Sequence, residues 1–158
     1  MKLLQTLILL CVTITIFGCD AFNAEEVARI DGNQLSTPED LQWKTTEIDL
    51  LAGDKIHFWA EMDMYYEGDL ALRFQVDIIQ NGDSLGMFEL DPMDKDVTMR
   101  EFRTEIDDEV EWRYSGRMGT MDIEEDGHYV FRAILISSPN ESLQLNKSNF
   151  VIKKSVKS

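Results

Sequence analysis

The chain has 158 residues, and its 30 aspartates and glutamates against 15 lysines and arginines give a formal net charge of −15. Such an excess of negative charge argues against nucleic acid as a partner and against electrostatic attachment to anionic lipid headgroups. The length is that of one domain, and it suffices to bury a core without a disulfide or a metal.

The N-terminus has the features of a secretory signal. Lys2 supplies a positive charge, an uncharged and mostly apolar run extends from Leu3 to Phe17, and Gly18 and Cys19 follow. A positive start, an apolar segment and a small residue before the cut are the elements of such a signal. The only other cysteine, Cys11, lies inside the apolar run, so the processed chain would have no second cysteine to pair with Cys19.

The four residues that end at Cys19, Ile-Phe-Gly-Cys, resemble the lipobox of bacterial lipoproteins. Ile16, Gly18 and Cys19 match that pattern, whereas Phe17 is larger than the residue usual at its position. The resemblance implies that the Cys19 sulfur carries two fatty acyl chains of the palmitate type and that the signal is cut before Cys19. More than one chain is needed for stable anchoring, because a single chain binds a membrane only marginally and reversibly. The implied location is the cell envelope, on the periplasmic or surface side of a membrane.

Two other interpretations of the N-terminus stay open. One is an ordinary secretory signal that is cut after Ala21 or Ala24, so that Cys19 is discarded. The other is an uncleaved membrane anchor. The uncharged run from Leu3 to Cys19 has 17 residues, which is short for a spanning helix of about 20 residues.

The lipoprotein interpretation divides the chain into a signal peptide (residues 1–18), a lipidated cysteine with a polar tether (19–38) and a β-sandwich domain (39–158). The tether is predicted because residues 20–38 are mostly polar or small, with Val27 and Ile30 as apolar anchors. A short helix near residues 24–30 is compatible with this composition.

Period two dominates the remaining sequence. From Ile56 to Tyr66 every second residue is apolar, and the pattern repeats between Leu70 and Ile78. Such alternation predicts strands with one buried and one solvent-facing side. The other predicted strands are 40–46, 85–90, 97–106, 110–114, 118–123, 128–136 and 148–153. Short strands separated by turn signals predict an all-β fold, a single antiparallel β-sandwich of the immunoglobulin-like or jelly-roll Greek-key type.

One local motif supports the sandwich. The stretch Glu125-Asp126-Gly127-His128-Tyr129 resembles the tyrosine corner of immunoglobulin-like and fibronectin-type domains. The resemblance implies that the Tyr129 hydroxyl bonds back to the backbone just upstream. Glu125 replaces the more usual aspartate, and Phe131 stands where antibody domains place a cysteine. A generic turn followed by a strand can have the same sequence. The motif is evidence about the fold and not about an activity.

The sequence predicts no enzyme. Neither a glycine-rich phosphate loop nor the Gly-x-Ser-x-Gly nucleophile elbow occurs. A serine or cysteine triad would need His57 or His128, and both are predicted to face outward from strands without a marked nucleophile nearby. Paired carboxylates for glycoside cleavage stay open, but 30 acids make any chosen pair uninformative. An envelope hydrolase is kept as a further alternative.

Metal binding is the stronger site hypothesis. Asp91, Asp94 and Asp96 lie in the turn-rich segment Asp-Pro-Met-Asp-Lys-Asp, where their carboxylates could converge on Ca²⁺. The spacing is not that of an EF-hand and Lys95 lies inside the cluster, so solvated loops are the competing interpretation. Met62 and Met64 have a spacing that soft-metal sites use, but they share the phase of the predicted core. No cofactor is otherwise expected.

A ligand-binding face is predicted on the solvent-facing side of the strand over residues 55–66. Trp59, with His57 and Tyr65, has the phase opposite to the apolar set. An exposed aromatic ring on a sandwich could stack on a sugar or anchor a protein. The competing interpretation is that another segment covers this side. The expected function is therefore a lipid-anchored, non-enzymatic binding or envelope-interaction module that binds an envelope protein or glycan. A calcium-stabilised carbohydrate-binding module is the alternative.

Overall fold

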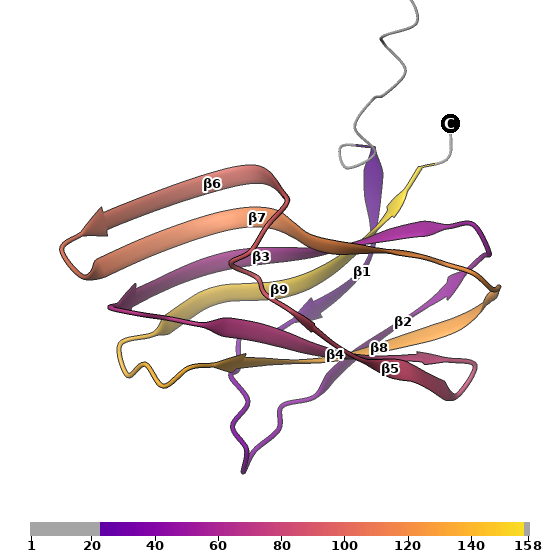
Figure 1. Cartoon of the computed structure of the whole chain (residues 1–158), viewed down its shortest axis with the longest axis horizontal. Helices are drawn as coiled ribbons and strands as arrows, with labels where there is room; N and C mark the ends of the chain where they lie inside the picture. The colour runs from indigo at the N-terminus through magenta and orange to yellow at the C-terminus, as the bar shows by residue number, and fades with distance from the viewer. Residues whose placement is uncertain (1–22, 157–158) are drawn as a thin grey trace, which may run out of the picture.

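The computed structural model describes residues 23–156, which form nine strands in two antiparallel sheets packed face to face (Figure 1). The strands are β1 (Ala24–Asp31), β2 (Lys44–Leu50), β3 (Lys55–Glu67), β4 (Leu72–Gln80), β5 (Asp83–Leu90), β6 (Val97–Ile106), β7 (Glu109–Asp122), β8 (Gly127–Ser137) and β9 (Gln144–Ser155). The all-β sandwich expected from the alternating pattern is confirmed. Within the described residues, no helix has the length and hydropathy to cross a membrane.

The strand order identifies the sandwich as a jelly roll. The five-stranded sheet has the order β1-β9-β3-β7-β6, and the four-stranded sheet has the order β2-β8-β4-β5. The first strands pair with the last in reverse sequence, β1 with β9, β2 with β8 and β3 with β7, while β4 and β5 form a hairpin. A folded ribbon of this kind, rolled into two sheets, is the double Greek key. Strand β6 is an addition, because it joins the outer edge of β7 as a hairpin.

The core lies between the two sheets and follows the predicted alternation. In β3 and β4 the predicted inward residues from Ile56 to Tyr66 and from Leu72 to Ile78 are all buried. Phe150 of β9 is at its centre, with its ring stacked 5.6 Å from that of Phe58 and tilted 5.5 Å from that of Phe74. The aromatic rings thus join both sheets.

The corner expected near Tyr129 is present. The buried Tyr129 donates a hydrogen bond from its hydroxyl to the carbonyl oxygen of Glu125, four residues upstream, at 2.9 Å. Asp126 also fixes this turn, since its carboxylate accepts from the amide of Ala52 at 2.7 Å. The corner therefore has the hydrogen bond of the immunoglobulin-like motif although the strand order is that of a jelly roll.

Two predictions about the chain's organisation are wrong. The sandwich begins at Ala24 and not at residue 39, because β1 pairs with β9 throughout residues 24–31. Strand β1 lies at the edge of its sheet, and one of its faces is partly exposed to solvent. It therefore needs few apolar residues, and its composition resembles that of a tether. The second error concerns β7, which is one strand from Glu109 to Asp122 and not two, because a bulge opposite Phe58 and Trp59 absorbs the irregularity.

Candidate functional site

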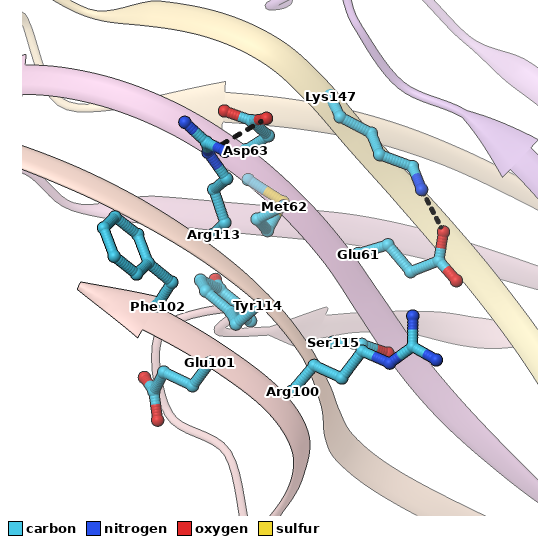
Figure 2. A pocket seen from close by; sticks show the side chains of 10 residues that line it. All are labelled: Glu61, Met62, Asp63, Arg100, Glu101, Phe102, Arg113, Tyr114, Ser115 and Lys147. Carbon is cyan, nitrogen blue, oxygen red and sulfur yellow. Dashed lines mark ion pairs between the residues drawn. The ribbon is translucent and has the colours of Figure 1, made fainter.

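A shallow groove of about 360 Å³ crosses the outer face of the five-stranded sheet (Figure 2). We call it the outer groove. Its lining residues come from β3, β6, β7 and β9: Glu61, Met62, Asp63, Arg100, Glu101, Phe102, Arg113, Tyr114, Ser115 and Lys147. Most of the lining residues are charged and come from four neighbouring strands, whereas Met62 and Tyr114 belong to the buried core. It carries both signs of charge and one exposed aromatic ring.

Glu61 is the electrostatic centre of the groove's rim. Its Oε2 atom accepts from Nη1 of Arg29 on β1 at 2.8 Å and from Nζ of Lys147 on β9 at 2.7 Å. The hydrogen bonds from Arg29, opposed in part by burial and assisted by Lys147, lower the pKa of Glu61 to about 2. Hydrogen bonds with Glu26, and then with Glu61, raise the pKa of Arg29 above its ordinary value. One carboxylate therefore holds three strands together.

We expect this carboxylate to make stability pH-dependent. The folded-state pKa of about 2 lies below the ordinary value of 4.5, so the contribution is complete above pH 4.5 and is lost as the pH falls towards 2. After allowance for the partly exposed partners, the loss should be about 1–2 kcal/mol of unfolding free energy. Urea unfolding of the wild-type chain and of Glu61→Gln at pH 6 and pH 3 measures it. The variant should lose less stability on acidification, whereas Glu25→Gln, an exposed acid of β1, should behave as wild type; equal acid sensitivity in all three would contradict the prediction.

A different part of the groove has an arginine without a side-chain partner among the described residues, and an exposed aromatic ring beside it. Among the described residues, Arg100 forms no ion pair or side-chain hydrogen bond, and its guanidinium extends along the groove beside Ser115 (Figure 2). Phe102 is 54 % exposed, and the guanidinium of Arg113 lies 5.7 Å from its ring centre. A guanidinium fork, a hydroxyl and a ring face are the groups that recognise an anionic group attached to a flat or apolar surface.

A buried lysine supports the strand that carries these residues. Lys95 lies across the core side of the sheet, with its Nζ 3.9 Å from the ring centre of Tyr114 and 4.2 Å from that of Trp112. Its ammonium pairs with Oε1 of Glu101 at 3.0 Å, and the same oxygen accepts from the Trp112 indole at 2.8 Å. Gly116 makes room for this arrangement, because a Cβ there would lie 2.4 Å from the lysine Cδ.

The predicted ligand face around Trp59 is not an exposed face. Trp59 and His57 are buried, at 0 % and 1 % exposure, and Tyr65 alone is partly exposed, with its hydroxyl bonded to Glu67. Lys153 of β9 covers the indole, with its Nζ 4.0 Å from the ring centre. Alternation shows which side of a strand faces the core, but it does not show that long side chains from neighbouring strands cover the other side.

The predicted calcium cluster is not assembled either. Asp91 pairs with Nη1 of Arg73 at 2.6 Å and accepts from the amide of Met93, while Asp96 holds Arg117 by two bonds of 2.8 Å. Asp94 is exposed between them. Within residues 23–156 no group of three or more acidic, histidine or cysteine side chains has the geometry to hold a metal ion. Arg73 and Arg117 thus neutralise two of the carboxylates that the sequence pattern predicts as Ca²⁺ ligands.

The two histidines have structural partners. Nε2 of His57 lies 2.7 Å from Oγ of Ser155, and Nδ1 lies 3.4 Å from Nη1 of Arg117. Because a guanidinium only donates, Nδ1 accepts and the proton is assigned to Nε2, which then donates to the serine and cannot activate it. His128 lies between Asp49 and Glu47, which raise the pKa of the imidazole.

The functional candidates that sequence reasoning missed are Arg100, Phe102 and Ser115. Residues 97–106 were expected to form a strand, and β6 has these bounds. The available signal was the composition of this segment, which mixes arginine, glutamate and large apolar residues without a buried face. The predicted lipidation site, Cys19, lies outside the described residues.

Fold and groove together define a jelly-roll β-sandwich with a charged groove on one sheet. No family model and no curated protein sequence matches the chain. Among solved structures, one similar chain is that of the crystal structure of the infectious bursal disease virus VP2 subviral particle, with 10 % identity and a TM-score of 0.36. The match covers 84 % of this chain but only 30 % of the viral one, so this chain spans less than a third of that protein's length.

Proposed function

We propose that the chain is a lipid-anchored, non-enzymatic binding module of the cell envelope, held to a membrane through acylated Cys19. The lipobox-like residues from Ile16 to Cys19 support the anchor. The start of β1 at Ala24 supports a close attachment, because few residues separate it from Cys19. On this proposal the sandwich lies near the membrane surface.

The observation that carries the binding function is the combination of Arg100, Ser115 and Phe102 along the outer groove. Arg100 is a cation without a partner among the described side chains, and Phe102 is exposed beside it. The chain has a formal charge of −15, so most of its surface charge is negative. An available guanidinium beside an aromatic ring is a local exception to this negative charge, and it favours an anionic partner. An envelope protein or a glycan that bears carboxylates has the required chemistry.

The anchor is tested by expressing the full chain in a bacterial host and labelling it with palmitate. The wild-type protein should incorporate the label and sediment with membranes, whereas Cys19→Ser should do neither. Thr45→Ser, a change on an exposed position of β2, is the control. Secretion of an unlabelled, shortened wild-type protein would overturn the lipoprotein assignment.

The groove is tested in the same cells by photo-crosslinking from benzoylphenylalanine placed at Ser115, with Thr45 as the control position on the other sheet. A defined adduct should form from position 115 alone, and Arg100→Glu should reduce it by about tenfold. Purified cell-wall sacculi provide the glycan arm, in which the wild-type domain should co-sediment more than Arg100→Glu does. No adduct and no co-sedimentation would overturn binding at the groove.

A further inference from the structure

In the part of the chain that the structure describes, strand β6 is a free edge of the five-stranded sheet. It pairs with β7 along residues 97–106, and it is the last strand in the sheet order (Figure 1). Its ten residues are long for an edge, and Met99, Phe102 and Ile106 are 47 %, 54 % and 66 % exposed. A long edge with exposed apolar side chains is a template for pairing with another strand.

The charges of β6 suit pairing with a copy of itself. The strand carries Arg100, Glu101, Arg103 and Glu105, two of each sign, and is therefore neutral in a chain of formal charge −15. In an antiparallel pair related by a two-fold axis, one residue lies opposite its own copy and its flanking residues lie opposite each other. The choice of the central residue therefore determines which residues lie opposite each other across the pair.

Four of these registers are excluded by charge. Centring on Arg100, Glu101, Arg103 or Glu105 places that residue opposite an identical charge, which is destabilising. Centring on Thr104 leaves only residues 102–106 opposed, because the turn after Ile106 ends the strand. Centring on Phe102 opposes residues 98–106, and it places Glu101 opposite Arg103 twice and Phe102 opposite its own copy.

We infer that β6 forms an antiparallel pair with β6 of a second copy of this chain, centred on Phe102. The two five-stranded sheets then become one continuous sheet across the two-fold axis. Atoms for the new ion pairs are available: both contacts of Glu101 use Oε1, and Arg103 pairs with Glu105 through Nη2 alone. Oε2 of Glu101 and the remaining guanidinium donors of Arg103 make no hydrogen bond among the described residues, so they could bond across the pair, although the Arg103 guanidinium also lies 4.5 Å from the ring centre of Trp112.

The other apolar edge is less suited to such pairing. Strand β5 exposes Leu85, Met87 and Phe88, but it is interrupted by Gly86 at φ 127° and by a bulge opposite Ile78 and Ile79. Its charged residues, Asp83 and Glu89, are both acidic and have no basic residue of β5 to oppose them. A bulged edge of one charge sign is a device against strand addition.

Pairing at β6 would also enlarge the outer groove. Phe102 and Arg100 line the groove and lie on the outer side of β6, so the two-fold axis would bring two grooves together. Phe102 of one copy would lie beside Phe102 of the other, and Arg100 of each copy opposite Thr104. The inference does not depend on the anchor or on a groove ligand, and it can hold if both fail.

Disulfide trapping tests the register. All nine strands and the core lie between Ala24 and Ser155, so the chain from Asp20 to Ser158 contains the whole sandwich and has no cysteine. Phe102→Cys should yield a disulfide-linked dimer under mild oxidation, because directly opposed positions bring the sulfurs within bonding reach. Thr104→Cys tests the register that is centred on Thr104, and Phe88→Cys tests pairing at the β5 edge. Equal yields at the three positions, or a higher yield at position 104 or 88, would overturn the proposal.

Sedimentation equilibrium tests the association without a crosslink. The unsubstituted domain should show a concentration-dependent monomer–dimer equilibrium. Phe102→Lys places two like charges at the axis and should raise the dissociation constant about tenfold, whereas Phe88→Lys should not change it. Circular dichroism of both variants verifies that the fold is kept. A domain that stays monomeric at its highest soluble concentration would overturn the proposal.

Discussion

Replacing Trp59 by alanine should lower the free energy of unfolding by about 3–5 kcal/mol. The indole is fully buried on the outer side of β3, between the backbone of the central strand and the side chain of Lys153. Its removal loses the burial of a large ring and leaves a cavity that the paired strands cannot close. Urea unfolding of the domain, followed by circular dichroism at fixed protein concentration, measures the change.

Trp59→Phe is the matched control. The indole Nε1 of Trp59 is buried without a hydrogen-bond partner among the described residues. Phenylalanine removes this unsatisfied donor and keeps most of the apolar ring, so the variant should lose far less stability than the alanine variant. A loss below about 0.5 kcal/mol for Trp59→Ala, which is the usual effect of a surface substitution, would show that the ring is exposed as the sequence pattern suggested.

Glu101→Gln should lower the free energy of unfolding by about 2–3 kcal/mol, although the Glu101 side chain is itself 41 % exposed. The reason is its partner, because the Lys95 side chain is only 7 % exposed and its ammonium relies on this carboxylate and on two aromatic rings. The amide keeps an oxygen that can accept from Trp112, so the substitution removes the charge and little else. Thermal and urea unfolding at low protein concentration separate this effect from self-association.

A double-mutant cycle gives the control. Lys95→Met removes the ammonium but keeps an apolar stem that can lie over Tyr114 and Gly116. In the double variant with Glu101→Gln no charge is left without its partner, so the double variant should be more stable than the sum of the two single losses predicts. Strict additivity would contradict the coupling of Lys95 to Glu101.

These variants also connect stability to the proposed surface. Lys95 and Glu101 fix β6 against β7, and β6 presents both the groove residues Arg100 and Phe102 and the free edge. The pKa of Glu101 is lowered chiefly by its hydrogen bond from Lys95 and further by that from Trp112. A lowered carboxylate pKa means that this support weakens on acidification, as it does for Glu61.

The sequence by itself determined the class of fold and most of the strands. Alternation from Ile56 to Tyr66 and from Leu72 to Ile78 is a local property, since successive side chains of a strand point to opposite faces whatever the topology. The Tyr129 corner was also predictable, because its hydrogen bond to Glu125 spans four residues. The bounds of the strand over residues 97–106 were also predicted correctly.

Only the tertiary structure decided which outward residues are accessible. Trp59 and Phe102 both lie on the outer face of the five-stranded sheet, yet one is covered and the other is half exposed. The difference is their place in the sheet order: β3 has neighbours on both sides whose long side chains cover it, and β6 has a neighbour on one side. Likewise the local pattern around Asp91 and Asp96 suggests Ca²⁺ and does not show their ion pairs, because Arg73 and Arg117 are distant in sequence and meet them only in the fold.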